Sequence, residues 1–120
     1  MSYTVELYRP EFLRRAIAEQ LGDWTDADPI PEADRDQIAA HLKGAGYIQE
    51  NSHPQFGQSF GHPDERLGIQ ASIHAGSISF NVPYWEDATE GIMIVKELAQ
   101  ELAERFDLML YDPQTGETDP

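Results

Sequence analysis

Apolar and polar residues alternate in two regions of the chain, which is typical of strands that bury one face. The first region is residues 3–8, and the second comprises residues 69–74 and 77–82. Two shorter apolar stretches, 47–50 and 108–111, are further strand candidates. The pattern therefore predicts a sheet of about five strands.

The second region fits a hairpin with a single register. A two-residue turn at 75–76 pairs His74 with Ser77 and places Ile73 opposite Ile78. In this register every apolar side chain of both strands lies on one face. The glycine at the second turn position is expected to supply a positive φ angle. The opposite face is polar, and we expect it to be solvated or to form an interface.

Apolar residues recur every three or four positions in three other stretches, which indicates helices with one buried face. These stretches are residues 10–21, 31–43 and 89–106. Pro10 suits the first turn of the first helix, and glycines follow the first two helices where helices commonly end. Residues 87–90 have the spacing of an N-terminal cap for the third helix.

The resulting order of elements is β-α-α-β-β-β-α-β. It predicts an α+β two-layer sandwich, with a mostly antiparallel sheet and helices on one face. With one helix treated as an insertion, the order approximates a ferredoxin-like variant. We expect a single domain over residues 1–113, followed by a flexible C-terminal tail over 114–120. Residues 51–66 contain prolines and glycines without a regular period, so we expect a loop there.

The net charge of the chain limits the kinds of partner that it can bind. The net charge of the 120 residues is −14, from 22 acidic and 8 basic side chains. Such a surface repels phosphate backbones and anionic lipids, so we expect neither nucleic acid nor a membrane as a partner. It favours encounter with a basic protein partner.

Cysteine usage and hydropathy bear on the compartment. The chain has no cysteine, which excludes disulfides, thiolate chemistry and cysteine zinc sites. Its first residues lack the basic and apolar regions of a signal peptide, and no apolar run is long enough to span a membrane. We therefore expect a cytoplasmic protein.

The sequence presents no catalytic motif. Neighbouring carboxylates at 64–65 and 86–87 are explained by helix capping and solvation. There is no cysteine nucleophile and no Gly-x-Ser-x-Gly elbow. We therefore predict a protein that is not an enzyme and needs no cofactor.

Aromatic residues with acidic neighbours are the strongest candidates for binding a partner. Tyrosine and tryptophan anchor many protein interfaces, and carboxylates commonly surround such anchors when the partner is basic. The candidate residues are Trp24, Asp26, Asp28, Tyr84, Trp85, Glu86 and Asp87. In the alternative interpretation the three aromatic side chains simply cover the ends of the core.

The two ends of the chain resemble a known class of proteins. Residues 1–8 and 97–114, including the Tyr-Asp-Pro-Gln of 111–114, are similar to the opening strand and the last helix and strand of small acidic bacterial immunity-type proteins of polymorphic toxin systems. The resemblance implies a non-enzymatic acidic binder, and it assigns no role to any single residue.

Three hypotheses follow. The first is a protein-binding module such as a toxin-immunity or inhibitor protein. The alternative is a small-ligand or metal-binding protein that uses His53 and His62, which flank the expected loop. The third is a homodimer formed through the polar face of the hairpin or through an edge strand.

Overall fold

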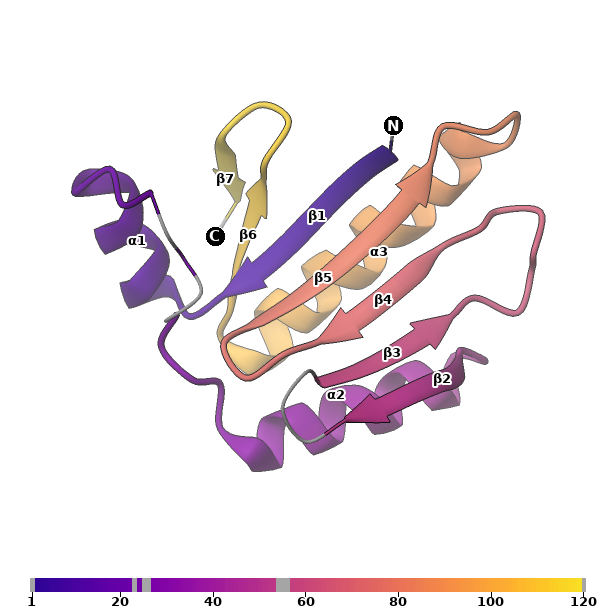
Figure 1. The fold of residues 1–120 in the computed structure, drawn as a ribbon, viewed down its shortest axis with the longest axis horizontal. Coiled ribbons are helices and arrows are strands. Elements are labelled where there is room, and N and C mark those ends of the chain that lie inside the picture. The colour runs from indigo at the N-terminus through magenta and orange to yellow at the C-terminus, as the bar shows by residue number, and fades with distance from the viewer. Residues whose placement is uncertain (1, 23, 25–26, 54–56, 120) are drawn as a thin grey trace.

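The computed structural model describes residues 2–22, 24, 27–53 and 57–119, with the backbone alone described at 51–53, 117 and 119. These residues form three helices and seven strands (Figure 1). The helices are α1 (Pro10–Ala18), α2 (Glu32–Gly44) and α3 (Ala88–Phe106). The strands are β1 (Ser2–Tyr8), β2 (Ile48–His53), β3 (Gly57–Gly61), β4 (Gln70–Ile73), β5 (Ser77–Pro83), β6 (Met109–Asp112) and β7 (Glu117–Asp119).

The predicted α+β class is confirmed. The strands form one sheet in the order β2-β3-β4-β5-β1-β6-β7, and every neighbouring pair is antiparallel. Without α1, β2, β3 and β7, the remaining elements follow the β-α-β-β-α-β order of the ferredoxin-like pattern. Figure 1 shows α2 and α3 together behind the sheet, which gives the two layers.

The main core lies between the sheet and these two helices. Phe60, Phe80 and Leu7 from the sheet are fully buried against residues such as Leu42 of α2 and Leu102 of α3. Burial of this apolar surface is the main favourable contribution to folding. None of the described helices is sufficiently long and apolar to cross a membrane.

A smaller cluster forms on the other face of the sheet, which we call the outer face. Tyr8 of β1 and Met109 of β6 are buried there against Phe12, Leu13 and Ala16 of α1. Leu7 and Tyr8 are adjacent in a strand and therefore point to opposite faces, yet both are buried. The end of β1 is thus covered on both faces, and α1 covers one end of the outer face.

The register predicted for the hairpin is confirmed. Ile73 lies opposite Ile78, and the backbone N–H of His74 donates to the carbonyl of Ser77 at 2.8 Å. The expectation for the turn glycine is wrong, because the φ angle of Gly76 is not positive. Glycine is needed there for space: a methyl group at Gly76 would lie 2.8 Å from the Cβ and from the carbonyl oxygen of Ala27.

The expectation of a loop over residues 51–66 is wrong for much of its length. Strand β2 continues into it, and β3 pairs with both β2 and β4. Ladder hydrogen bonds need only backbone groups, so a strand can form without apolar alternation when one side chain, here Phe60, is buried. Gly57 begins β3 with φ at +86°, and a side chain there would overlap the carbonyl oxygen of Ile73.

The segment expected as a tail also contains a strand, since β7 pairs with β6. Gln114 lies in the connection between them and reaches across to β1. Its side-chain oxygen accepts a hydrogen bond from the Thr4 N–H at 2.8 Å, and its side-chain nitrogen donates to the Thr4 carbonyl at 2.9 Å.

Candidate functional site

The structure places the predicted partner-binding residues in two separate regions. Trp24 contacts the ring of Tyr8 at one end of β1, whereas Tyr84 follows Pro83, which lies opposite Ser2 at the other end. The candidate residues therefore lie at two separate places on the molecule. Asp26 lies outside the described residues.

The first region is the aromatic corner, formed by Tyr84, Trp85 and Glu86 between β5 and α3. Tyr84 is 50% exposed and Trp85 is 57% exposed, and Glu86 is exposed beside them. The backbone N–H of Trp85 donates to the carbonyl of Pro83 at 2.8 Å, and its carbonyl accepts from Ala88 at 3.1 Å. These bonds hold the corner in one backbone conformation, so little further ordering is needed before it contacts a partner.

The Trp85 indole is also supported from one side. Gly68 has φ at +65°, and a side chain at that position would collide with the indole ring and with Pro83. The ring therefore lies against the backbone of the segment between β3 and β4. It is an exposed but positioned aromatic group.

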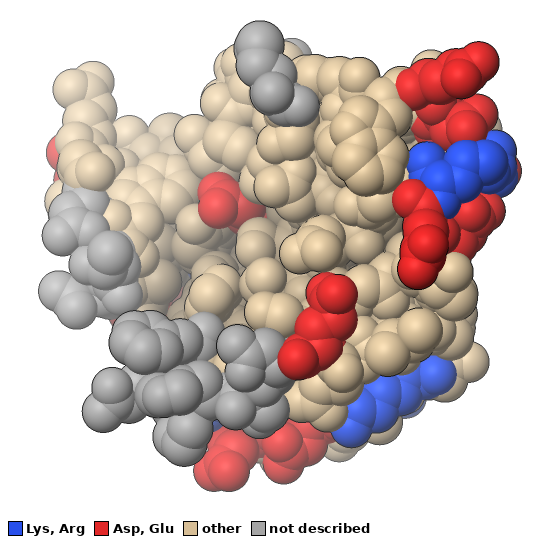
Figure 2. Space-filling view, turned by 45° about the vertical axis from the view of Figure 1, so that its right-hand side comes forward, with Lys and Arg blue, Asp and Glu red and all other residues tan. Residues whose placement is uncertain are grey.

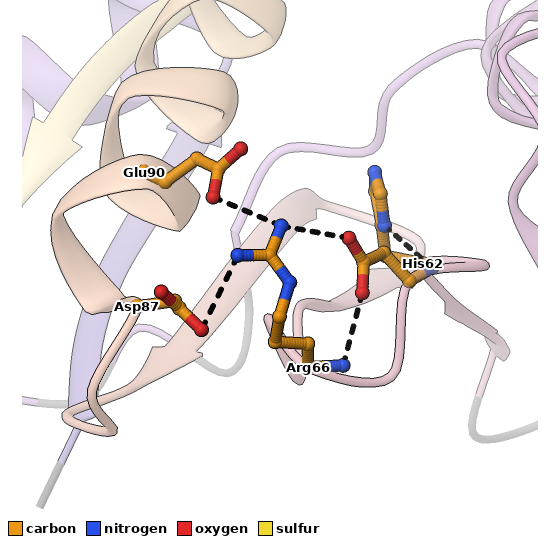
Figure 3. Close-up of polar contacts among 5 residues, drawn as sticks. His62, Arg66, Asp87 and Glu90 are labelled. Carbon is orange, nitrogen blue, oxygen red and sulfur yellow. Dashed lines mark hydrogen bonds and ion pairs between the residues drawn. The ribbon is translucent and has the colours of Figure 1, made fainter.

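An ion-pair cluster lies next to the aromatic corner. The guanidinium of Arg66 lies 3.0 Å from a carboxylate oxygen of Asp64, 3.3 Å from one of Asp87 and 3.0 Å from one of Glu90 (Figure 3). The hydrogen bond from Arg66 holds the pKa of Asp64 below its ordinary value. Asp87, predicted as a free acidic contact for a partner, is instead paired with Arg66, which leaves Glu86 as the exposed carboxylate of the corner.

The alternative site at the histidines is only partly described. His62 packs its ring edge-on against Tyr47, with 5.1 Å between ring centroids. Its Nδ1 accepts a hydrogen bond from the backbone N–H of Asp64 at 3.0 Å, which leaves Nε2 as its remaining coordinating atom (Figure 3). The side chain of His53 lies outside the described residues. Within the described part of the chain, no group of three or more metal-ligating side chains comes together.

The second region is a cavity of about 490 Å³ on the outer face, which we call the outer-face cavity. Glu6, Tyr8 and Ser79 of the sheet form its floor. Its walls are the hairpin turn at 74–77 on one side and Trp24 with Ala27 on the other. Glu6 is the one carboxylate among the described residues that line the cavity.

The segment after Trp24 is fixed to the hairpin turn. The backbone N–H of Ile30 donates to the carbonyl of Ala75 at 2.8 Å, and Ala27 packs against Gly76. Asp28 forms an ion pair with Arg15 of α1 at 3.5 Å. The two walls of the cavity are thus bound to each other at one end, so the cavity is part of the folded structure.

Trp24 covers one end of the smaller core cluster, as in the alternative interpretation of the aromatic residues. Its indole N–H donates to the carbonyl of Leu21 at 2.9 Å. Its ring centroid lies 5.3 Å from that of Tyr8, 6.1 Å from that of Phe12 and 4.9 Å from that of Tyr111. It is half-buried, and its remaining surface lines the outer-face cavity.

Glu6 places a carboxylate in the lining of the cavity. Burial raises its pKa, while a hydrogen bond with Tyr8 and the field of His74 partly oppose the shift. Burial, and next the charge of Glu6, raise the pKa of the Tyr8 hydroxyl. Among the described residues, no lysine or arginine forms an ion pair with Glu6. The fold therefore keeps a half-buried carboxylate without a lysine or arginine partner, and His74 is the one basic side chain among the described residues that line the cavity.

The site residues predicted from the sequence did not include Glu6, Tyr8, His74 or Ser79. Their only signal was their position on the polar face of two predicted strands. Comparisons with known proteins gave no match: no family model, no curated protein and no solved structure is significantly similar to this chain.

Proposed function

We propose that this chain is a non-enzymatic protein-binding module, of the toxin-immunity or inhibitor type, that docks a basic protein through the aromatic corner. The observation that carries the proposal is the pair of adjacent, half-exposed aromatic side chains, Tyr84 and Trp85, on a turn fixed by backbone hydrogen bonds. Tyrosine and tryptophan are the residues most enriched among energetic hot spots of interfaces.

The charge distribution supports a basic partner. The chain carries a net charge of −14, and Glu86 beside the aromatic pair is exposed. Figure 2 shows acidic side chains in several separate groups on the visible surface. Such a distribution speeds encounter with a basic protein, while the aromatic anchors govern the lifetime of the complex.

Affinity capture from a lysate of the source organism tests the proposal when three baits are compared. The wild-type chain and Ile48→Ala, which truncates another exposed apolar side chain, 61% exposed on β2, should retain the same basic protein. Trp85→Ala should lose it. We expect its affinity for the partner to fall by about thirtyfold or more, because hot-spot truncations commonly cost about 2 kcal/mol or more. Equal retention by Trp85→Ala, or no retained protein at low and moderate salt, would contradict the proposal.

The alternative of a small-ligand or metal-binding protein at His53 and His62 remains a hypothesis with its own test. Isothermal titration with zinc, nickel and manganese should give heat that His62→Ala abolishes if this hypothesis holds. The absence of heat in the wild-type chain would remove the metal version of it.

A further inference from the structure

We infer that the outer-face cavity is a binding site for an organic cation, an alkylammonium or guanidinium group carried on a short apolar body. The inference rests on the lining of the cavity and not on the proposed function of the aromatic corner. The two regions lie at opposite ends of β1 and β5, so each can be tested while the other is unchanged.

The carboxylate of Glu6 determines the sign of the ligand. It lies on the floor of the cavity beside Tyr8, which lines the same floor. A half-buried carboxylate gains most from a donor that also carries positive charge, because such hydrogen bonds are shorter and stronger than neutral ones. An anionic ligand would meet like charge at the same point.

The other lining groups determine the kind of cation. Trp24 provides an aromatic wall and Ala27 an apolar one, and Ser77 and Ser79 place hydroxyl groups at the β5 side. Aromatic rings attract ammonium and guanidinium groups, and hydroxyl oxygens accept their remaining N–H bonds. Metal ions instead require several converging anionic or imidazole ligands, and the described residues contain no such group.

The size of the cavity agrees with a small organic molecule or one side chain. Its volume of about 490 Å³ lies within the usual range for small-molecule sites, about 300–1,000 Å³. Ala27 packs against Gly76, and the backbone N–H of Ile30 donates to the carbonyl of Ala75, so the two walls are joined at this end before any ligand binds. A site that exists before the ligand binds loses little affinity to reorganisation.

Nitrogen-15 NMR of the wild-type chain, titrated with arginine amide at pH 8, tests the inference. The chain has two tryptophans, so its spectrum contains two indole N–H signals. The Trp24 signal should shift with saturation, because that indole lines the cavity, and the Trp85 signal should stay in place. Citrulline amide, which has nearly the same shape but a neutral side chain in place of the guanidinium, should bind at least about tenfold more weakly.

Two variants with the same change of charge form the matched pair. Glu6→Gln keeps the shape and an acceptor oxygen of the side chain but removes its charge, and it should weaken the binding of arginine amide by about tenfold or more. Glu104→Gln removes a carboxylate exposed on α3 and should leave the affinity unchanged. Glu6→Gln should also unfold at the same or a higher temperature than wild type, which excludes misfolding as the cause of lost binding.

Three results would overturn the inference: no shift of the Trp24 signal, equal binding of citrulline amide, or equal binding by Glu6→Gln. The source of the cation is distinguished by a second titrant, a blocked pentapeptide with a central arginine. Binding of both titrants indicates a basic side chain of a protein, and binding of arginine amide alone indicates a free small molecule; both results support the cation site. Because the readout is Trp24, loss of partner binding at Trp85 would not change it.

Discussion

The outer-face cavity and the aromatic corner use the same kinds of residue in opposite ways. Each combines tryptophan, tyrosine and a carboxylate, yet Trp24 is packed among three aromatic rings, whereas Trp85 is 57% exposed. Glu6 is half-buried, whereas Glu86 is exposed. A concave site of this kind selects a small charged group, and a convex one contributes area to a larger interface. Composition alone does not distinguish the two.

Truncating the two tryptophans should give the largest difference between the regions. We expect Trp24→Ala to lower the free energy of unfolding by about 2–3 kcal/mol, because it removes a half-buried ring that contacts Tyr8, Phe12 and Tyr111. Trp85→Ala should lower it by about 1 kcal/mol or less, since most of the ring is already in water. Urea denaturation measures both, and equal losses would remove the distinction between a packed and an exposed tryptophan.

A side chain added where the two walls of the outer-face cavity meet should have the next largest effect on stability. Gly76→Val introduces a side chain where Ala27 already lies 2.8 Å from the position of a Cβ. We expect a loss of stability of about 1–3 kcal/mol, because the 27–30 segment must move away from the hairpin turn. The Trp24 indole N–H signal should shift and the Trp85 signal should not. If neither signal moved, a displacement at the hairpin turn would not reach the Trp24 side of the cavity.

The half-buried carboxylate of Glu6 should change how the free energy of unfolding depends on pH. The folded-state pKa of Glu6 is raised, so its contribution is most favourable below the unfolded pKa and is lost as pH rises through the folded pKa. Glu6→Gln should therefore gain stability relative to wild type between acid and neutral pH. Denaturation curves from pH 4 to pH 7 give this difference, and a constant difference would mean that the carboxylate is not desolvated.

The smallest effect is expected at the ion pairs beside the aromatic corner. Arg66→Gln removes three ion pairs, but the arginine side chain is 50% exposed. Exposed ion pairs contribute little, so we expect a small loss of stability that shrinks further in high salt. Denaturation at two salt concentrations measures it. A large, salt-independent loss would show that Arg66 organises the corner as strongly as Ala27 and Gly76 organise the cavity.

The two regions also differ in how far the sequence could predict them. The aromatic corner is built from consecutive residues between a strand and a helix, and the hairpin register that precedes it follows from strict alternation. The cavity joins Glu6, Trp24, the turn at 74–77 and Ser79, and no local pattern connects segments so far apart. Its assembly depends on α1 and the following segment folding over the outer face, which periodicity does not indicate.

Strands β3 and β7 were missed for a related reason. Each is short, and each joins the sheet through backbone hydrogen bonds rather than through an alternating apolar face. In β3 the glycines that suggested a loop are at its two ends, where Gly57 fits against the carbonyl of Ile73. Prediction from side-chain patterns works best where side chains decide the structure, as in α3 and the hairpin.

The Gln114 side chain has a consequence for association between molecules. Strand β1 pairs with β6 only from Glu6 to Tyr8, so Thr4 extends beyond its neighbour on that side. The Gln114 amide accepts from the backbone N–H of Thr4 and donates to its carbonyl, so it makes the two hydrogen bonds that a neighbouring strand would otherwise make there. An open donor and acceptor at this point would template the addition of another chain. The Gln114 carboxamide thus occupies the backbone groups that an added strand would need, and we expect Gln114→Ala to leave them open to pairing with another copy of the chain.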